Sequence, residues 1–405
     1  MIEESTYSEE DLRAVVPFLP AEEPQVTLPP GGGPGRIIRV SETLLDGNEE
    51  NYLRECIRTN WISSGGPFVK RLETEFAERA GCRFGVACSS GTAALHLALA
   101  VLGLGPEDEV ILPAFTMIAG ANCIVHAGAR PVLVDSEPHT GNMDVEQLAS
   151  RITPRTRAIL VVHMYGHPVD MDPVLKLARQ RDLVVIEDAA EAHGALYHGR
   201  PVGGIGDIGA FSFYANKIVT TGEGGMVTTN DARTAELARS LRDNAFSGGR
   251  RFVHEFCAFN YRMTNLQAAV GLAQLERLDA LVEIRRRTRR FYEKHLAGIP
   301  GVRLLEELPG YRAVHWMNCI LVDERHGCSR DELRRRLARN GIETRTTFVP
   351  VHLQPCYRSR FRGEAFPVSE TLCRDGLLLP SGPMMNEDLV EYVAECIADV
   401  SRPAE

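Results

Sequence analysis

The chain has 405 residues, of which 44% are hydrophobic and 24% charged, and its formal net charge is -9 at pH 7. This composition is typical of a globular protein with a large core and excludes a fibrous or wholly disordered chain. The acidic balance argues against nucleic acid as the main partner, because phosphate contacts need a basic surface.

No targeting or membrane signal is visible. The first residues, MIEESTYSEEDLR, lack the basic and then apolar order of a signal peptide, and no apolar run approaches the ~20 residues that span a bilayer. The ten cysteines are scattered singly without metal-binding spacing, so we expect reduced thiols and no metal site. The sequence therefore predicts a cytoplasmic protein without a membrane partner.

The predicted elements begin after an N-terminal extension, residues 1–38. It ends in LPPGGGPG, which favours turns or a loose linker. Further on, short apolar runs alternate with longer amphipathic ones, which predicts an α/β fold with a mostly parallel sheet covered by helices. Seven strands are expected at residues 84–88, 108–113, 130–135, 158–166, 183–188, 209–214 and 224–229. Helices are expected at residues 92–103, 171–182 and 231–243.

Two domains follow from this pattern. The seven strands belong to a large domain at residues 39–280. A segment of helical character, residues 261–297, is expected to link it to a smaller α+β domain at residues 281–405. In that domain we expect a strand in HWMNCILVD and a helix in DELRRRLARNG.

Lys217 is the first candidate for a reacting residue. It lies in a short polar loop between two expected strands, with glycines just beyond it. An amine at a buried strand end is poorly hydrated, so its pKa falls and it becomes able to form a Schiff base with a carbonyl. A solvated surface lysine is the commoner situation for a lysine taken alone. The other strand ends decide between the two interpretations.

Ligands collect at the carboxyl ends of the strands in open parallel sheets. Ser90, Gly91 and Thr92 join one strand end to a helix, which predicts a phosphate site, although a plain helix cap would explain them as well. Glu187 and Asp188 end another, very apolar strand. A carboxylate buried there needs a cationic partner, either a protonated pyridine nitrogen or an arginine.

Further polar groups follow two other strands. His163 comes after the strand at residue 158, where a lone histidine is more often a packing residue, and Ser212 precedes Lys217 as a second phosphate donor. A phosphate site, a buried carboxylate and a desolvated lysine together describe pyridoxal 5'-phosphate (PLP). We therefore expect this cofactor.

Four strings carry a family resemblance: SSGTAALHLAL, VVIEDAAEAHGA, FSFYANKIVTTGEGGMVTTND and FNYRMTNLQAAVGLAQLERLD. They resemble the DegT/DnrJ/EryC1/StrS family of sugar aminotransferases, within the fold type I superfamily typified by aspartate aminotransferase. The likeness covers roughly residues 39 to 400. It implies that Lys217 forms the internal aldimine, that Asp188 pairs with the pyridine nitrogen, and that Gly91, Thr92 and Ser212 hold the phosphate.

The resemblance implies further roles and two departures. Asn260 would reach the phosphate of the partner subunit, so that the site is complete only in a homodimer, and His163 would lie beside the cofactor. Glu191 points to the nucleotide-sugar C4 aminotransferases. Met117 stands where most relatives stack an aromatic ring on the cofactor, and Val349 where many carry a histidine.

The implied reaction moves an amino group from L-glutamate to the keto carbon of a dTDP- or GDP-linked 4-keto-6-deoxyhexose, with pyridoxamine phosphate as the intermediate form. Amination at C3 or of a cyclitol ketone stays open. A dehydratase of the same family would carry histidine in place of Lys217. A non-catalytic member should have lost Lys217 or Asp188, and both are present.

Overall fold

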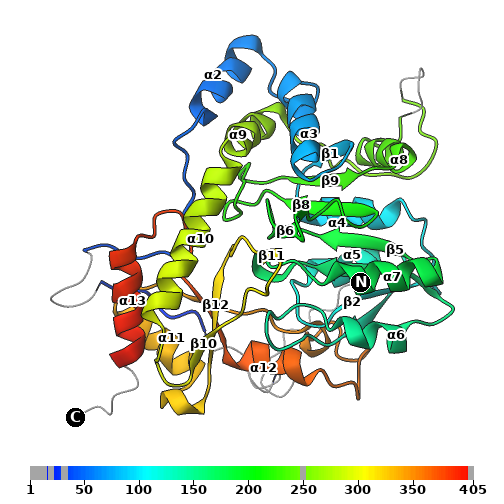
Figure 1. Ribbon diagram of the computed structural model, residues 1–405. Coiled ribbons are helices and arrows are strands. Elements are labelled where there is room, and N and C mark those ends of the chain that lie inside the picture. The colour runs from blue at the N-terminus through cyan, green and yellow to red at the C-terminus, as the bar shows by residue number, and fades with distance from the viewer. Residues whose placement is uncertain (1–15, 17–21, 29–34, 247–251, 400–405) are drawn as a thin grey trace.

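The computed structural model describes residues 16, 22–28, 35–246 and 252–399. Its main feature is a seven-stranded sheet with the strand order β1-β9-β8-β5-β4-β2-β3 (Figure 1). β9 runs antiparallel to both of its neighbours, whereas the other pairs are parallel. The mostly parallel sheet predicted from the sequence is confirmed. Its strands are β1 (Phe84–Cys88), β2 (Glu109–Pro113), β3 (Arg130–Val134), β4 (Thr156–Val162), β5 (Val184–Asp188), β8 (Ile208–Ser212) and β9 (Gly225–Thr229).

Helices cover both faces of this sheet because its strands are apolar on both sides. Ile111 and Val185 pack in one buried cluster with residues of α7, whereas Leu112 and Leu160 belong to another cluster with α4 and α5. Figure 1 accordingly shows α7 in front of the sheet and α4 and α5 behind it. The helices around this sheet are α3 (Pro67–Arg79), α4 (Gly91–Ala100), α5 (Ala119–His126), α6 (Leu148–Arg151), α7 (Met171–Arg181) and α8 (Ala232–Arg242).

The chain leaves the large sheet through α9 (Asn265–Leu275) and α10 (Leu278–His295). Thr264 begins α9 with a capping box, in which its side chain accepts from the Gln267 N–H and the Gln267 side chain accepts from the Thr264 N–H. α9 packs against α2 (Glu49–Thr59) and α3. The helical segment expected at residues 261–297 is therefore two helices with a break between them.

A second, four-stranded sheet has the order β10-β12-β14-β13 and is antiparallel throughout. Its apolar side chains form one buried cluster with those of α10, α11 and α13. In a three-stranded sheet of order β11-β6-β7, β11, which precedes β12 in the chain, pairs with β6, and β6 pairs with β7; β6 and β7 follow β5. These elements are β6 (Leu196–Tyr197), β7 (Arg200–Pro201), β10 (Val302–Leu304), β11 (Tyr311–Arg312), β12 (Asn318–Val322), β13 (Arg345–Thr346), β14 (Gly376–Leu379), α11 (Arg330–Arg339), α12 (Pro367–Asp375) and α13 (Glu387–Asp399), with short 3-10 turns at Val145–Gln147, Met164–Gly166, Glu324–His326 and Val351–Leu353.

The predicted domain boundary after residue 280 falls inside α10, so the division into two domains stays a prediction. Most of the predicted N-terminal extension lies outside the described residues. Its residues 22–28 contact α11: the Thr27 N–H donates to the Ala338 carbonyl at 3.1 Å, and Arg334 Nη2 to the Glu22 carbonyl at 2.5 Å. In the part of the chain that the structure describes, no helix combines the length and apolar character needed to cross a bilayer.

Candidate active site

The carboxyl ends of β4, β5 and β8 lie next to one another at one edge of the large sheet. Asp188 is the last residue of β5, His163 directly follows β4, and Ser212 is the last residue of β8. β1 runs in the same direction as β8, since both are antiparallel to β9, and α4 follows it. The structure thus gathers residues from four separate segments at one edge of the sheet.

Lys217 is held in a buried position on the loop after β8. Only 11% of its side chain is exposed, and its Nζ lies 3.5 Å from Glu191 Oε1. Burial lowers the pKa of the Lys217 amine, and the Glu191 and Asp188 carboxylates oppose that shift. A partly desolvated amine of this kind is a better nucleophile and base near neutral pH than an exposed lysine.

The Glu191 carboxylate is itself held in place by a backbone hydrogen bond. Its Oε2 accepts a hydrogen bond from the Tyr165 N–H at 2.9 Å. Burial raises the pKa of Glu191, while Lys217 lowers it again. Tyr165 has a left-handed backbone, with φ at 51°, which a non-glycine residue adopts at a cost. This turn follows the end of β4 and directs the Tyr165 N–H at Glu191.

Asp188 is 7% exposed. Its Oδ1 accepts from the Ala190 N–H at 3.1 Å, the only hydrogen bond to its carboxylate among the described residues. Burial raises the pKa of Asp188, which the Ala190 N–H and then the charges of Lys217 and His163 partly offset. This carboxylate has spare capacity to accept a hydrogen bond from a cationic group.

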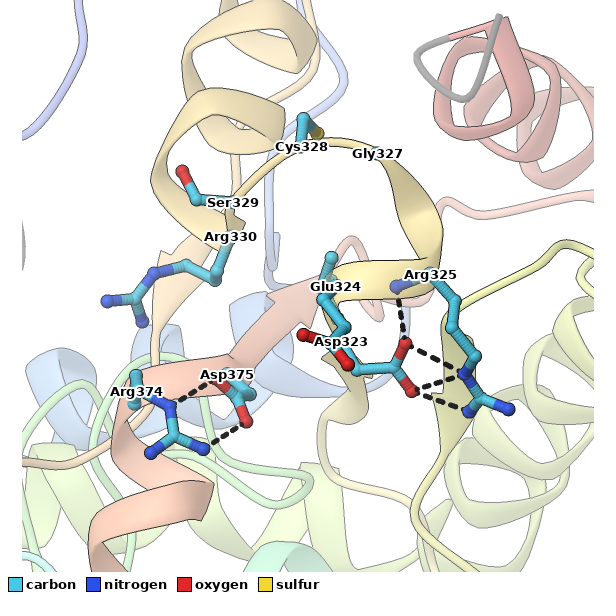
Figure 2. A pocket seen from close by; sticks show the side chains of 10 residues that line it. Asp323, Glu324, Arg325, Gly327, Cys328, Ser329, Arg330, Arg374 and Asp375 are labelled. Carbon is cyan, nitrogen blue, oxygen red and sulfur yellow. Dashed lines mark hydrogen bonds and ion pairs between the residues drawn. The ribbon is translucent and has the colours of Figure 1, made fainter.

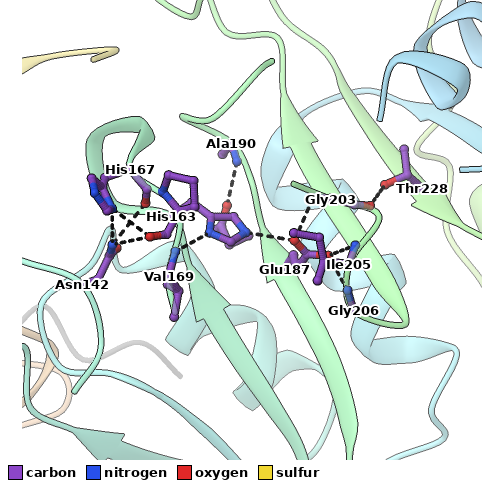
Figure 3. Close-up of polar contacts among 12 residues, drawn as sticks. Asn142, His163, His167, Val169, Glu187, Ala190, Gly203, Ile205, Gly206 and Thr228 are labelled. Carbon is purple, nitrogen blue, oxygen red and sulfur yellow. Dashed lines mark hydrogen bonds and ion pairs between the residues drawn. The ribbon is translucent and has the colours of Figure 1, made fainter. Parts of the chain in front are cut away.

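His163 and Glu187 form a separate network on the same strand ends (Figure 3). His163 Nε2 lies 3.0 Å from Glu187 Oε2, and His163 Nδ1 accepts from the Val169 N–H at 3.0 Å. Glu187 also accepts three backbone N–H groups, from Gly203, Ile205 and Gly206. Both ring nitrogens of His163 are therefore engaged within the protein. A catalytic role for His163 stays a prediction, and this geometry favours a role in holding the strand ends.

The start of α4 adjoins the end of β8. The Ser90 side chain caps the helix by accepting from the Ala93 N–H at 3.1 Å. A Cβ added at Gly91 would lie 2.5 Å from the Ser212 Cβ, so a residue without a side chain is needed there. The first-turn N–H groups of α4, at Gly91 and Thr92, have no partners within the helix. With the hydroxyls of Thr92 and Ser212, they form a donor set suited to a phosphate.

Two predicted residues lie outside this cluster of contacts. Met117 is 49% exposed, and its Sδ lies 3.1 Å from the Ala119 backbone nitrogen. Asn260 is exposed and bridged through its backbone to Asp243. None of the hydrogen bonds or ion pairs of the described residues joins Asn260 to Lys217 of the same chain. Their roles toward a cofactor stay predictions.

Trp316 and Arg285 were missed in the sequence. The Trp316 ring centroid lies 3.7 Å from Lys217 Nζ, and Arg285 donates to the Trp316 carbonyl at 2.9 Å. Trp316 lies in the segment HWMNCILVD, where a strand was expected, and Arg285 lies in the helical segment expected at residues 261–297; neither expectation points to the site. The one available signal was that Trp316 is one of only two tryptophans in the sequence. This does not indicate where in the fold its side chain lies.

A surface hollow of about 770 Å³ lies elsewhere, between the end of β12 and the start of α11 (Figure 2). Two ion pairs lie in its lining: Arg325 Nη2 lies 2.5 Å from Asp323 Oδ2, and Arg374 Nε lies 2.8 Å from Asp375 Oδ1. Because these two arginines are already paired within the protein, we assign no ligand to the hollow.

Comparisons with known proteins agree with this geometry. The model of the DegT/DnrJ/EryC1/StrS aminotransferase family matches residues 44–398. The GDP-perosamine synthase of Caulobacter vibrioides is 46% identical over 90% of this chain and 98% of its own. That of Escherichia coli O157:H7 is 41% identical over 89% of this chain and 98% of its own. The solved structure of DesI with its TDP-sugar product is 32% identical, has a TM-score of 0.85, and matches 92% of this chain and 94% of that one.

These matches cover nearly the whole of each relative, so the likeness is not confined to one domain or motif. They confirm the resemblance seen in the four sequence strings and the predicted aminotransferase fold. The chain belongs to the DegT/DnrJ/EryC1/StrS aminotransferase family.

Proposed function

We propose that this aminotransferase uses PLP to move the amino group of L-glutamate to the keto carbon of a GDP-linked 4-keto-6-deoxyhexose, giving a 4-amino-4,6-dideoxy sugar. The observation that carries the proposal is the buried Lys217 amine, 3.5 Å from Glu191, on the same sheet edge as Asp188. The choice of C4 and of GDP is supported by the two GDP-perosamine synthases, which match nearly end to end.

The residues present fit PLP. The open N–H groups at the start of α4, with Thr92 and Ser212, would hold the phosphate, and the missing side chain at Gly91 leaves room beside them. Asp188 would hold the ring nitrogen, and Lys217 the aldehyde. When bound, PLP supplies the carbonyl group that takes up the amino group and an electron-accepting ring.

The chain's own residues then manage protons and charge. Lys217 would take the Cα proton of glutamate and deliver it to the cofactor carbon that is bonded to the amino nitrogen, which its lowered pKa makes possible near neutral pH. The Asp188 carboxylate keeps a proton on the nitrogen opposite it, so that negative charge formed during the reaction is stabilised. Glu191 and Trp316 hold the lysine and exclude water from its amine.

The test is an amination assay with glutamate and two matched substrates, the GDP- and dTDP-linked 4-keto-6-deoxyhexoses. We expect turnover with the GDP sugar, weak turnover with the dTDP sugar, and none with Lys217→Ala. Borohydride reduction followed by peptide mass spectrometry should place the cofactor on Lys217. Attachment to another lysine, or equal turnover of Lys217→Ala, would contradict the proposal.

We also propose a homodimer with shared active sites. Asn260 is exposed, and several large apolar side chains near it in the chain are exposed as well, as an interface would require. These side chains are Phe246, Phe252, Val253 and Phe256. All ten cysteines are free, which supports a cytoplasmic location for this assembly.

Subunit mixing tests the shared site. In a heterodimer of Lys217→Ala and Asn260→Ala chains, one site combines both defects and the other has neither. Random reassociation should therefore restore about a quarter of the wild-type activity, because half of the dimers are mixed and each has one intact site. No gain on mixing would show that Asn260 acts within its own chain or not at all.

A further inference from the structure

The Trp316 ring forms one wall of the position that Lys217 occupies. Lys217 Nζ lies 3.7 Å from the ring centroid, close enough for a cation–π interaction. Nζ also lies 3.5 Å from Glu191 Oε1. The lysine nitrogen therefore contacts both the face of an indole and a carboxylate.

The indole is fixed in this position by several hydrogen bonds. Its Nε1–H donates to the carbonyl of Asn216, the residue before Lys217, at 2.8 Å. The Trp316 backbone N–H donates to the Tyr165 carbonyl at 3.0 Å. Arg285, which is 3% exposed, donates to the Trp316 carbonyl at 2.9 Å and to the Ser381 carbonyl at 2.8 Å.

The backbone around Trp316 is also strained. His315, directly before it, has a φ of 47°, and Tyr165, opposite it, has a φ of 51°. Non-glycine residues keep such conformations only where the surrounding structure imposes them, and these positions gather at functional sites. The ring is thus held in place by two constrained segments and a buried arginine.

This arrangement suits a positively charged lysine. Burial disfavours the ammonium form, whereas the negative face of an aromatic ring and a carboxylate both favour it. A neutral lysine alone would need neither group. The site therefore contains two separate stabilisers for an ε-ammonium that burial would otherwise neutralise.

We propose that Trp316 and Glu191 form a seat for the ε-ammonium of Lys217 in the states in which that lysine is not attached to the cofactor. The inference rests on the proposed function, because only a lysine that is repeatedly released needs a second fixed position. Trp316 is then a positioning residue: it keeps the released, protonated amine within reach of the reaction without letting it move into solvent.

The test varies the negative electrostatic potential of the Trp316 ring face and leaves the size of the ring almost unchanged. The Trp61→Phe variant keeps Trp316 as its only tryptophan, so 5-fluoro- and 5,7-difluorotryptophan can be incorporated at that position alone. Fluorination weakens the negative face of the ring. We expect the pH midpoint for acylation of Lys217 in the cofactor-free chain to fall stepwise, by about one pH unit in total.

Exposed Lys176 on α7 serves as the internal control in the same peptide mass spectra, and its midpoint should stay constant. The fluorine NMR signal should shift with the same midpoint as the acylation, and the shift should vanish in Lys217→Met. The proposed role of Trp316 would be overturned by an acylation midpoint that does not change on fluorination. It would also be overturned by a pH-dependent fluorine shift that persists in Lys217→Met.

The proposed function can be judged separately in these samples. If borohydride still fixes PLP to Lys217 while fluorination has no effect, the seat is wrong and the PLP-binding lysine stands. If PLP attaches elsewhere, the proposed function itself fails.

Discussion

Glu187 and His163 form a fully buried pair, with 3.0 Å between Glu187 Oε2 and His163 Nε2 and 0% exposure of either side chain. Because His163 Nδ1 accepts from the Val169 N–H, the ring proton lies on Nε2 and is donated to Glu187. The pair joins the ends of β4 and β5. It fixes the backbone from which Asp188 projects.

The first prediction concerns this pair. Each oxygen of the Glu187 carboxylate accepts hydrogen bonds from two donors, so in Glu187→Gln the amide NH2 group would face two of the four donors and leave them buried without an acceptor. We expect the free energy of unfolding to fall by about 3 kcal/mol, measured by urea denaturation. Glu50→Gln, at an exposed ion pair on α2, is the matched control and should have little effect. Equal stability of both variants would contradict a structural role for the pair.

The second prediction is a pH dependence. In the proposed function the neutral amine of Lys217 attaches PLP, and the fraction of neutral amine rises with pH through the lysine pKa. Burial lowers that pKa from 10.5, so the rate of PLP attachment to the cofactor-free protein should level off at a lower pH than for an exposed lysine. Glu191 raises the pKa again, so Glu191→Gln should move the midpoint down by about one further pH unit and speed attachment below it.

Absorbance spectroscopy at a series of pH values measures this rate. Glu223→Gln, in the exposed glycine loop beyond Lys217, removes a carboxylate of the same type without touching the amine, and its profile should match the wild type. A Glu191→Gln midpoint at or above the wild-type value would mean that the carboxylate does not stabilise the ammonium form.

Much of the fold could be predicted because its physical cause is local. Both faces of the large sheet are buried, so each strand is a short apolar run that the sequence displays directly. The carboxyl ends then had to meet at one edge, which is why Asp188 and Lys217 could be paired in advance. The break between α9 and α10 was not visible, because the apolar spacing continues across Glu276 and Arg277.

Contacts that depend on tertiary packing could not be predicted. Trp316 reaches Lys217 from a segment about a hundred residues later, and no local pattern encodes that approach. The partners of His163 were not predictable for the same reason: the sequence indicates that a carboxylate at Glu187 or Asp188 needs a cationic partner, but not that Glu187 pairs with His163. Sequence reasoning found the groups of the candidate site but not the contacts that hold them.

The third prediction concerns the start of α4. Gly91→Ala should be tolerated by the helix itself, because alanine has the higher helix propensity. The added Cβ would however lie 2.5 Å from the Ser212 Cβ, so the two segments that we propose to bind the phosphate must move apart. We expect PLP affinity to fall at least about tenfold, measured by titration of the cofactor-free protein.

Gly120→Ala on α5 is the control for this substitution, because its Cβ would make only ordinary contacts, the nearest at 3.7 Å. It should bind PLP as the wild type does. Unchanged affinity in Gly91→Ala would place the phosphate away from the start of α4.

The fourth prediction concerns Asp188 and separates its effect on PLP binding from its effect on kcat. Asp188→Asn keeps the shape of the side chain and can still accept a hydrogen bond, but it removes the negative charge that we propose keeps the cofactor nitrogen protonated. We expect kcat to fall by about two orders of magnitude or more while PLP stays bound, because a preorganised charge contributes mainly to the transition state. Asp188 also raises the pKa of Lys217, so the PLP-attachment midpoint should move to lower pH in the same variant. Asp172→Asn, at an exposed ion pair on α7, is the control, and wild-type kinetics in Asp188→Asn would refute the charge partnership.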